Sequence, residues 1–292
     1  MIYGIRWKFL RKVSYTIKRK INAGSEMMEI RKKIYVSIPF SMLIETYLDA
    51  FIEHRINPEI SFGADCLDKY STKEYEYVAG RLHSQGLSIN IHAPYTDLCP
   101  GSPDPMVREV ASFRLNQILS IVPIFNAKSV VCHTGFDEKK YYEIRDVWRD
   151  NSLEIWRRVA EGLKEDGATL MLENVFEKRP EDMIFLINGL SSYDNVRLCF
   201  DAGHAHIFSI IPLDRWTLAL APFIGELHLH NNSGNWDEHR GLDKGLIDFK
   251  ALLGLISQHT NYLPIITFEV HNDEEFWSSL EYLEKIWPWK EE

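Results

Sequence analysis

Short apolar runs alternate with longer segments of helical spacing along most of the chain. These runs predict eight strands: Lys33–Ile38, Glu59–Phe62, Ser88–His92, Lys128–Thr134, Thr169–Asn174, Val196–Asp201, Glu226–Asn231 and Pro264–Val270. The intervening segments predict helices over about 40–54, 72–86, 105–125, 143–165, a stretch after Pro180, short helices within 205–222, then 249–258 and 274–286. Proline is favoured at a helix start, so Pro103-Asp104-Pro105 marks the beginning of the third helix.

Eight strand-then-helix units with near-continuous apolar strands predict a parallel β/α barrel. An open doubly wound sheet is the alternative, but its GxGxxG pattern is absent after the first strand. A chain of 292 residues, 45% of them hydrophobic, is long enough for one such domain. We therefore expect an α/β fold, a single-domain (β/α)8 barrel over residues 29–292, with a basic N-terminal extension over residues 1–28.

Six of the predicted strands end in side chains that commonly bind metal ions. In a β/α barrel the catalytic groups lie at the C-terminal ends of the strands, so these side chains are expected to meet at one mouth. The apolar run before Asp201 is typical, because it leads into the turn Asp201-Ala202-Gly203-His204. The candidate strand-end ligands are His92, His133, Glu173, Asp201, His204, His230 and Glu269.

Three of these candidates, Glu173, Asp201 and Glu269, are carboxylates that would crowd the barrel mouth. Like charges brought together out of water are costly unless protons or cations neutralise them. Neighbouring histidines supply nitrogen ligands, and mixed nitrogen and carboxylate ligation suits zinc, manganese or cobalt better than calcium. The triplet Asp237-Glu238-His239, in a Gly- and Asn-rich loop, can add two ligands from above.

Each residue alone has an ordinary structural interpretation. A histidine at a strand end is more often a satisfied polar residue than a ligand, and Asp201 could simply cap the next helix. Asp237 and His239 alone would be solvated loop residues. Their occurrence together at successive strand ends favours a site.

His228 and His230 point the same way in a regular strand, which predicts His230 as the ligand and His228 as a deeper outer partner or a substrate contact.

Two further residues near the expected mouth are candidates for binding substrate. Tyr95 follows His92-Ala93-Pro94 and could hydrogen-bond a substrate oxygen, or pack as an aromatic lid residue. Arg240 follows His239 and could meet a phosphate group.

The charge is unevenly distributed along the chain. Residues 1–28 carry seven Lys or Arg and one acidic residue, a net charge of +6, which leaves −15 for the rest of a chain whose net charge is −9. The acidic body argues against a general nucleic-acid binder, whose affinity comes from neutralising phosphates. The extension shows no signal-peptide pattern. It predicts a solvated segment ahead of Met27-Met28, or alternatively a basic helix at a membrane surface.

The four cysteines form no CxxC pair. They are expected to be small buried thiols in a reducing compartment, which favours a cytoplasmic location. The longest apolar runs are far shorter than a membrane span, so no transmembrane helix is expected.

As an ordered set, the strand-end motifs resemble the xylose isomerase-like TIM barrel superfamily. This superfamily includes the sugar phosphate isomerases/epimerases and endonuclease IV, of AP endonuclease family 2. The resemblance covers nearly everything after residue 30. It is carried by His92-Ala93-Pro94-Tyr95, Cys132-His133-Thr134-Gly135, Leu172-Glu173-Asn174, Asp201-Ala202-Gly203-His204, His228-Leu229-His230, Asp237-Glu238-His239 and Phe268-Glu269.

The resemblance implies one of two kinds of metal site. The epimerases imply one metal held by Glu173, Asp201, His230 and Glu269, with the two glutamates as paired acid and base. Endonuclease IV implies three zinc ions held by His92, His133, Glu173, Asp201, His204, His230, Asp237, His239 and Glu269. Zinc or manganese, one to three ions per chain, is therefore the expected cofactor.

We expect a metal-dependent isomerase or epimerase acting on a sugar or sugar phosphate. Glu173 and Glu269 would move the proton next to a metal-bound carbonyl, with His204 and Tyr95 orienting hydroxyls. The alternative is a multinuclear zinc phosphodiesterase, or AP endonuclease. Against it, the segment Ser37–Met42 and the loop Ala64–Ser71 hold no arginine to engage DNA. A third possibility is a non-catalytic, metal-dependent binding barrel; the sequence leaves the oligomeric state open.

Overall fold

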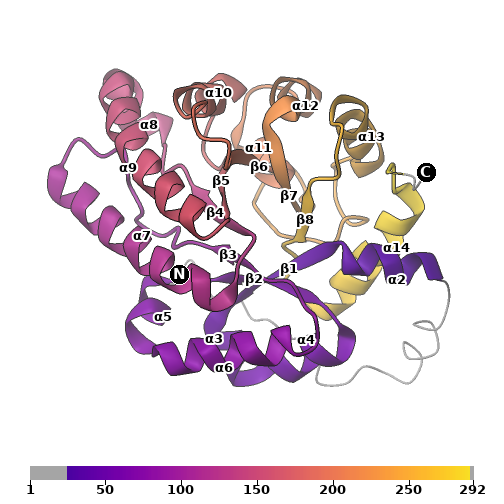
Figure 1. The fold of residues 1–292 in the computed structure, drawn as a ribbon. Coiled ribbons are helices and arrows are strands. Elements are labelled where there is room, and N and C mark those ends of the chain that lie inside the picture. The colour runs from indigo at the N-terminus through magenta and orange to yellow at the C-terminus, as the bar shows by residue number, and fades with distance from the viewer. Residues whose placement is uncertain (1–24, 290–292) are drawn as a thin grey trace.

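The computed structural model describes residues 25–289, which form a barrel of strands surrounded by helices (Figure 1). Residues 1–24, most of the predicted extension, lie outside the described residues. The first described element is helix α2 (Ser25–Lys32), which packs against the last helix, α14 (Asp273–Ile286). Within residues 25–289, no helix has the length and apolar character that crossing a membrane requires.

Eight parallel strands close into a barrel in sequence order, and the last pairs with the first. This confirms the predicted (β/α)8 fold. The strand bounds lie within a few residues of the predicted ones: β1 (Ile34–Pro39), β2 (Asn57–Ser61), β3 (Asn90–His92), β4 (Ser129–His133), β5 (Thr169–Glu173), β6 (Val196–Asp201), β7 (Ile224–Leu229) and β8 (Ile265–Phe268).

Alternate residues of each strand face different surroundings. On β4, Val130 and Cys132 pack in the main core beneath the helices, whereas Val131 belongs to a separate small apolar cluster with Met171 and Cys199. Successive side chains of a strand point to opposite faces, so the small cluster lies inside the barrel. The apolar runs that predicted the strands thus serve mainly the outer layer, which leaves inward positions free for polar groups.

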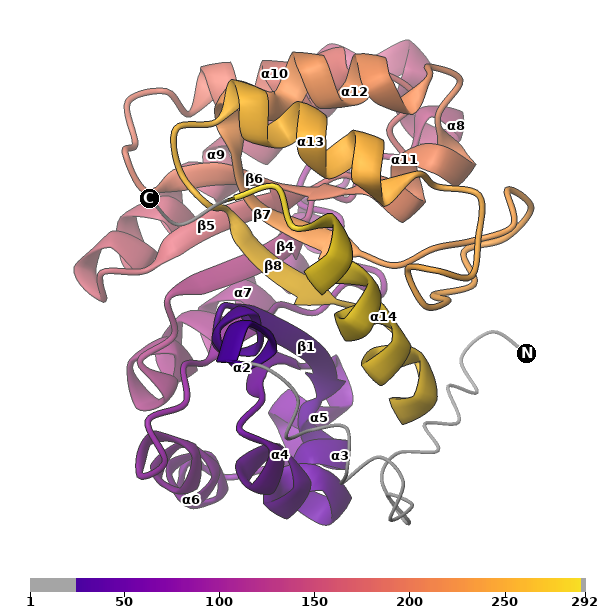
Figure 2. The same cartoon turned by 90° about the vertical axis from the view of Figure 1, so that its right-hand side faces the viewer.

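The helices form the outer layer of the barrel (Figure 2). Residues 40–54 are continuously helical as α3 (Phe40–Met42), a π-helical turn (Leu43–Tyr47) and α4 (Leu48–His54). Three short α-helices of the described chain were not predicted: α2, α5 (Ala64–Lys69) and α8 (Glu138–Tyr141). The remaining helices are α6 (Thr72–His83), α7 (Pro105–Phe125), α9 (Arg145–Glu165), α10 (Pro180–Gly189), α11 (Ala202–Phe208), α12 (Leu213–Leu220) and α13 (Phe249–His259).

Local sequence fixes where α7 begins. Asp104 accepts a hydrogen bond from Met106 N at 2.9 Å, and Pro105 supplies the first helical residue of α7, as predicted.

All four cysteines are free thiols, and three of them are buried while Cys99 is partly exposed.

Candidate metal centre at the barrel mouth

The structure brings all nine predicted ligands together at the C-terminal ends of the strands. In the described part of the chain, five overlapping groups have potential ligand atoms within 4.8 Å of one another, and three of these groups contain all nine. These three groups are His92, His133 and Glu173; His204, His230, Asp237 and His239; and Glu173, Asp201, His228 and Glu269. Glu173 belongs to the first and third groups, and His204 of the second group lies 3.2 Å from Glu173, so the three form one continuous centre. The metal-binding role of each residue remains a prediction.

The first group comes from three consecutive strands. One oxygen of Glu173, at the end of β5, lies 3.1 Å from Nε2 of His92 and 3.2 Å from Nε2 of His133. His133 and Glu173 are register partners on β4 and β5, so strand pairing alone places them side by side. The other ring nitrogen of His92 lies 2.7 Å from the carbonyl oxygen of Ala93, which fixes the ring.

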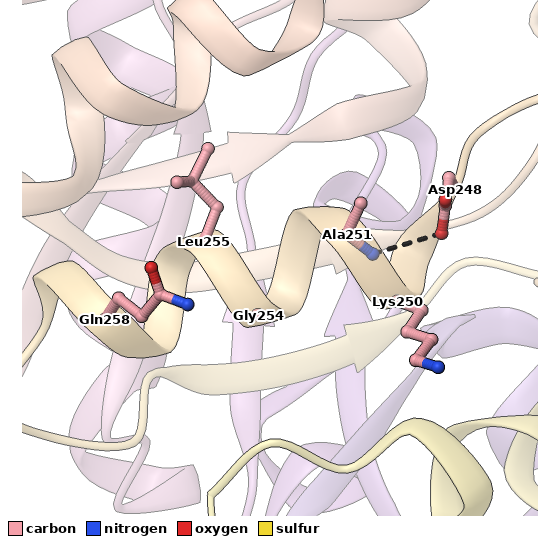
Figure 3. A pocket seen from close by; sticks show the side chains of 6 residues that line it. All are labelled: Asp248, Lys250, Ala251, Gly254, Leu255 and Gln258. Carbon is pink, nitrogen blue, oxygen red and sulfur yellow. Dashed lines mark hydrogen bonds between the residues drawn. The ribbon is translucent and has the colours of Figure 1, made fainter.

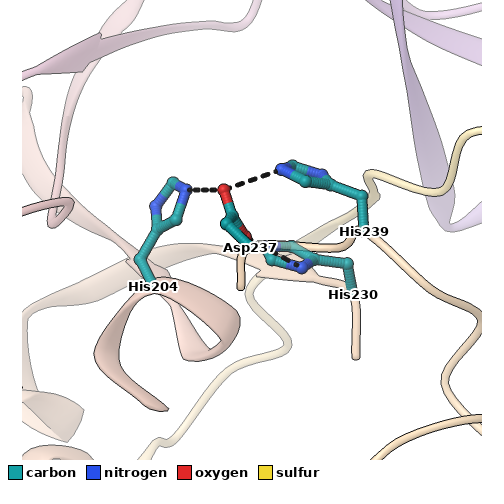
Figure 4. Close-up of side chains that lie close together, drawn as sticks. All are labelled: His204, His230, Asp237 and His239. Carbon is teal, nitrogen blue, oxygen red and sulfur yellow. Dashed lines mark hydrogen bonds and ion pairs between the residues drawn. The ribbon is translucent and has the colours of Figure 1, made fainter. Parts of the chain in front are cut away.

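The second group combines α11, the end of β7 and the loop that follows β7 (Figure 4). One oxygen of Asp237 lies 3.3 Å from Nε2 of His204 and 3.1 Å from Nε2 of His239. The His239 ring stacks on the His230 ring, with centroids 4.0 Å apart and planes 9° apart. His239 has a φ of 51°, a left-handed conformation that non-glycine residues rarely adopt and that often occurs at functional sites.

Asp201 caps a helix, as the sequence suggested, and also faces the centre; its role as a metal ligand remains a prediction. Its Oδ1 caps α11 by accepting a hydrogen bond from the His204 N–H at 2.6 Å. Its Oδ2 faces the centre, 3.1 Å from Nε2 of His230. The same turn carries Gly203, and the His230 ring occupies the space where a side chain on Gly203 would lie. The sequence Asp201-Ala202-Gly203-His204 therefore starts a helix and shapes the site in four residues.

The third group contains His228, one layer deeper in the barrel than His230. Nδ1 of His228 lies 3.5 Å from Glu173 and 3.4 Å from Glu269, whereas Nε2 lies 3.2 Å from Glu59. The His228 side chain is fully buried among these three carboxylates. Its predicted roles, as an outer partner and as a contact with substrate, both remain predictions.

The carboxylates and histidines of the centre shift one another's pKa values. Burial would raise the pKa of Glu173, but the charges of His133 and His228 outweigh it and hold the pKa well below its usual range. Burial would also raise the pKa of Glu269, but the charge of His228 outweighs the effect of burial and lowers this pKa. For His239, burial would lower the pKa, but the hydrogen bond and charge of Asp237 raise it to about 9.

The donor set fits divalent metal ions. It supplies the nitrogens of histidines, which bind metal ions in their neutral form, and carboxylate oxygens. Zinc and manganese accept both kinds of ligand. Several of its buried atoms make no hydrogen bond in the described part of the chain: Glu173 Oε1, His228 Nδ1, His230 Nδ1 and Asp237 Oδ1. Buried polar atoms without a hydrogen bond are costly, and coordination to metal ions would satisfy them.

Two predicted substrate contacts lie at the edge of this centre. Tyr95 is 38% exposed, and its ring centroid is 5.3 Å from that of His133. Arg240 is exposed, and its backbone pairs with Asn231 through two hydrogen bonds of 2.9 Å, which anchor the far end of the loop that carries Asp237 and His239. Their predicted roles in binding substrate remain untested.

Sequence reasoning missed three residues near the centre. Glu59 on β2 and Glu226 on β7 are fully buried inside the barrel, and the His271 ring stacks on His239 with centroids 4.5 Å apart. Burial and the charge of His239 lower the pKa of His271 to about 4. Each is the first residue of a predicted strand, so an acidic residue at the start of the strand was the available signal for Glu59 and Glu226.

A surface hollow elsewhere on the molecule has a different character. It lies along α13 and is lined by Asp248, Lys250, Ala251, Gly254, Leu255 and Gln258 (Figure 3). Asp248 is engaged in capping the helix, accepting a hydrogen bond from Ala251 N at 3.0 Å. None of the lining residues belongs to the three ligand groups, so we place the functional site at the barrel mouth.

Comparisons with known proteins agree with this architecture. The uncharacterized protein MJ1311 of Methanocaldococcus jannaschii is 25% identical over 223 residues, which cover 74% of this chain and 75% of that protein. The TTHB071 protein of Thermus thermophilus, in a structure soaked with ZnCl2, is 25% identical with a TM-score of 0.73, covering 89% of this chain and all of that one.

A D-tagatose 3-epimerase-like protein has a similar fold, with 24% identity, a TM-score of 0.73, and coverage of 87% of this chain and 96% of that one. Residues 58–286 match the family model described as xylose isomerase-like TIM barrel. Together with the closed barrel and the strand-end groups, this match shows that the chain belongs to the xylose isomerase-like TIM barrel family.

Proposed function

We propose that the protein is a metal-dependent isomerase or epimerase acting on a sugar or sugar phosphate, with Glu173 and Glu269 as the proton-transfer pair. The observation that carries the proposal is the convergence of these two glutamates with Asp201. Their potential ligand atoms lie within 4.8 Å of one another although they come from β5, β6 and the end of β8. The similarity to a D-tagatose 3-epimerase-like protein supports a sugar substrate.

The ionisation of the two glutamates suits the role of base. Both carboxyl pKa values lie below their usual range, so both side chains are ionised at neutral pH and either can accept a proton from a substrate carbon. Glu269 keeps 12% of its side chain exposed, whereas Glu173 keeps 1%. Glu269 is therefore the more accessible of the pair, and His204 and Tyr95 would orient substrate hydroxyls.

The residues of the centre would hold zinc or manganese, one to three ions per chain. When bound, such an ion polarises a carbonyl oxygen and stabilises the negative charge that develops during proton removal. The chain's own contribution is to hold the carboxylates in place. Glu173 is held at the end of β5 and Glu269 directly after β8, and Asp201 is held by the cap that it forms on α11.

Solvent exchange tests this proposal. The purified full chain, loaded with manganese, cobalt or zinc, is incubated in D2O with a panel of aldoses, ketoses and their phosphates. We expect deuterium at the carbon next to the carbonyl, detected by NMR, and its loss in Glu173→Gln and Glu269→Gln. Glu154→Gln is the matched control, because Glu154 pairs only with Arg158 on the surface of α9 among the ion pairs described. Absence of exchange across the panel with all three metals would contradict the proposal.

A second candidate is a multinuclear zinc phosphoesterase. The observation that favours it is that the nine predicted ligands lie in three of the five overlapping groups, each of which could hold an ion. About three zinc ions per chain, together with cleavage of DNA at abasic sites, would support this candidate. One exchangeable manganese per chain without cleavage would contradict it.

A further inference from the structure

The loop that follows β7 presents Trp236 at the barrel mouth. Two hydrogen bonds between the backbones of Asn231 and Arg240, each 2.9 Å long, join the two ends of this loop. Inside the loop, the N–H group of Ser233 donates to the Glu238 carboxylate at 2.6 Å. Trp236 lies between these bonded residues, yet it is 77% exposed. The loop is therefore braced internally while its largest apolar side chain faces solvent.

The loop that follows β5 presents a second aromatic ring, that of Phe176, which is 46% exposed. This ring packs edge-on against Phe208 at the end of α11, with centroids 4.9 Å apart and planes at 69°. The Lys178 ammonium group donates to the Phe208 carbonyl, and the Ser209 hydroxyl donates to the Lys178 carbonyl at 2.8 Å. These contacts tie the loop to α11 and hold the Phe176 ring at the surface.

The two loops meet at His204. The Phe208 ring lies 6.0 Å from the His204 ring between centroids. Asp237, the residue after Trp236, lies 3.3 Å from Nε2 of His204 (Figure 4). The other ring nitrogen of His204 lies 3.2 Å from Glu173. The loops that carry the exposed rings therefore lie directly beside the proposed proton-transfer site.

Packing of the barrel does not explain why these rings are exposed. Apolar side chains exposed singly are common, but two rings presented by braced loops beside one candidate site indicate a surface that binds an apolar group. Aromatic faces pack against other aromatic rings and against the apolar C–H face of a sugar ring. The reacting sugar would lie at Glu173 and Glu269, so the exposed rings are placed to contact a part of the substrate beyond it.

We propose that Phe176 and Trp236 form a subsite for a second ring, so that the substrate is a sugar that carries a ring substituent. The substituent is either another sugar, as in a disaccharide with a free reducing end, or an aromatic group. This inference rests on the proposed function and narrows its substrate class. Contacts with the second ring supply binding energy remote from the reacting carbon, and such energy can be used to raise the rate of the reaction itself.

Exchange kinetics test the subsite. The full chain, loaded with manganese, cobalt or zinc, is assayed in D2O with glucose and fructose, with cellobiose, maltose and lactulose, and with 6-O-benzylglucose. We expect kcat/KM to be at least tenfold higher for substrates with two rings, and the disaccharide and benzyl arms show which second ring is preferred. Trp236→Ala and Phe176→Ala should each lower the ratio of two-ring to one-ring kcat/KM at least fivefold. The variants Trp236→Phe and Phe176→Tyr retain a ring and should keep most of this ratio.

Phe113→Ala is the matched control, because Phe113 is a 56% exposed ring on α7, in the outer helical layer. It should keep the wild-type ratio. A second readout needs no turnover: acrylamide quenching of Trp236 fluorescence, taken as the difference between wild type and Trp236→Phe. Saturating cellobiose or 6-O-benzylglucose should shield Trp236 from acrylamide, and glucose should not.

Each outcome bears on a different claim. A ratio near one in wild type, or an unchanged ratio in both alanine variants, would overturn the subsite and leave the proposed function standing. Absence of exchange with every sugar of the broad panel would overturn the proposed function, and quenching would then decide the subsite alone. A lower molecular mass of the alanine variants in analytical ultracentrifugation would assign the rings to contacts between copies of the chain, which also overturns the subsite.

Discussion

The His230 ring packs against the backbone of Gly203 so closely that a Cβ at Gly203 would stand 2.5 Å from Nε2 and 2.6 Å from Nδ1 of the ring. Gly203 and His230 both lie in well-packed parts of the structure. Gly203 lies in the first turn of α11, and His230 is fully buried at the end of β7. The absence of a side chain at position 203 therefore fixes where the imidazole of His230 can lie.

Gly203→Ala is expected to displace His230 and to weaken metal binding at its group at least tenfold, measured by titration of the metal-free chain with zinc. Overpacking of this kind typically costs about 1–3 kcal/mol of stability. Gly80→Ala is the control, because Gly80 lies within α6 and an added Cβ meets nothing within 4 Å. That variant should bind metal normally and gain about 0.5–1 kcal/mol. Unchanged zinc affinity in Gly203→Ala would contradict the expectation.

A substitution of Asp237, a predicted ligand in the loop after β7, distinguishes the two proposed functions. Asp237→Asn removes the carboxylate that His204 and His239 share, at 3.3 and 3.1 Å, without touching Glu173 or Glu269. Zinc content measured by atomic absorption should fall by about one ion per chain where the centre is multinuclear. For an isomerase served by the deeper group, proton exchange should persist in Asp237→Asn and vanish in Glu269→Gln. Equal loss of exchange in both variants would count against this division of roles.

Much of the fold follows from residue pattern, since apolar residues on the outer side of each strand pack beneath the helices. All eight strands were predicted for this reason. The short helices α5 and α8 were missed, because four to six residues hold too few turns to show helical spacing. The convergence of the ligands was also predictable, because a parallel barrel brings every C-terminal strand end to the same mouth.

The grouping of the ligands could not be predicted in the same way. Whether His228 or His230 approaches Glu173 depends on the register of β6 with β7, where Asp201 pairs with His228. Glu59 faces inward because of its register with Ser37 and Asn90 on the neighbouring strands. Such stagger is a property of the closed barrel, so these relationships follow from the structure alone.

The exposed residues at the mouth predict a difference between sugars and sugar phosphates. Arg240→Gln removes an exposed cation, so KM for a phosphorylated substrate should rise about tenfold or more while KM for the free sugar changes little. Tyr95→Phe keeps the ring beside His133 and removes only the hydroxyl, so it should raise KM for both substrates several-fold. Steady-state kinetics with a sugar and its phosphate measure both effects. An equal rise for both sugars in Arg240→Gln would exclude phosphate recognition by this residue.

Glu177 makes the folded chain sensitive to pH near neutrality. Its buried carboxyl group bonds the Thr134 hydroxyl and, at 2.7 Å, the Val175 N–H, and burial raises its pKa to about 7 from an ordinary 4.5. The folded state therefore binds this proton more tightly than the unfolded state does. The stabilisation is fully present below about pH 4.5 and is lost as pH rises through about 7, a decline of about 3 kcal/mol at most.

Glu177→Gln should remove this decline. The amide resembles the protonated acid, since its oxygen can accept from Val175 N–H and its NH2 group can donate to the Thr134 oxygen. Between pH 5 and 8, urea unfolding of the metal-free wild type should therefore show falling stability, and the variant should show a flatter profile that meets the wild type at the acidic end. Glu161→Gln, at a residue that bonds the Tyr193 hydroxyl on the surface, should keep the wild-type slope. Parallel profiles for wild type and Glu177→Gln would mean that Glu177 stays ionised in the folded chain, held by its two donors despite its burial.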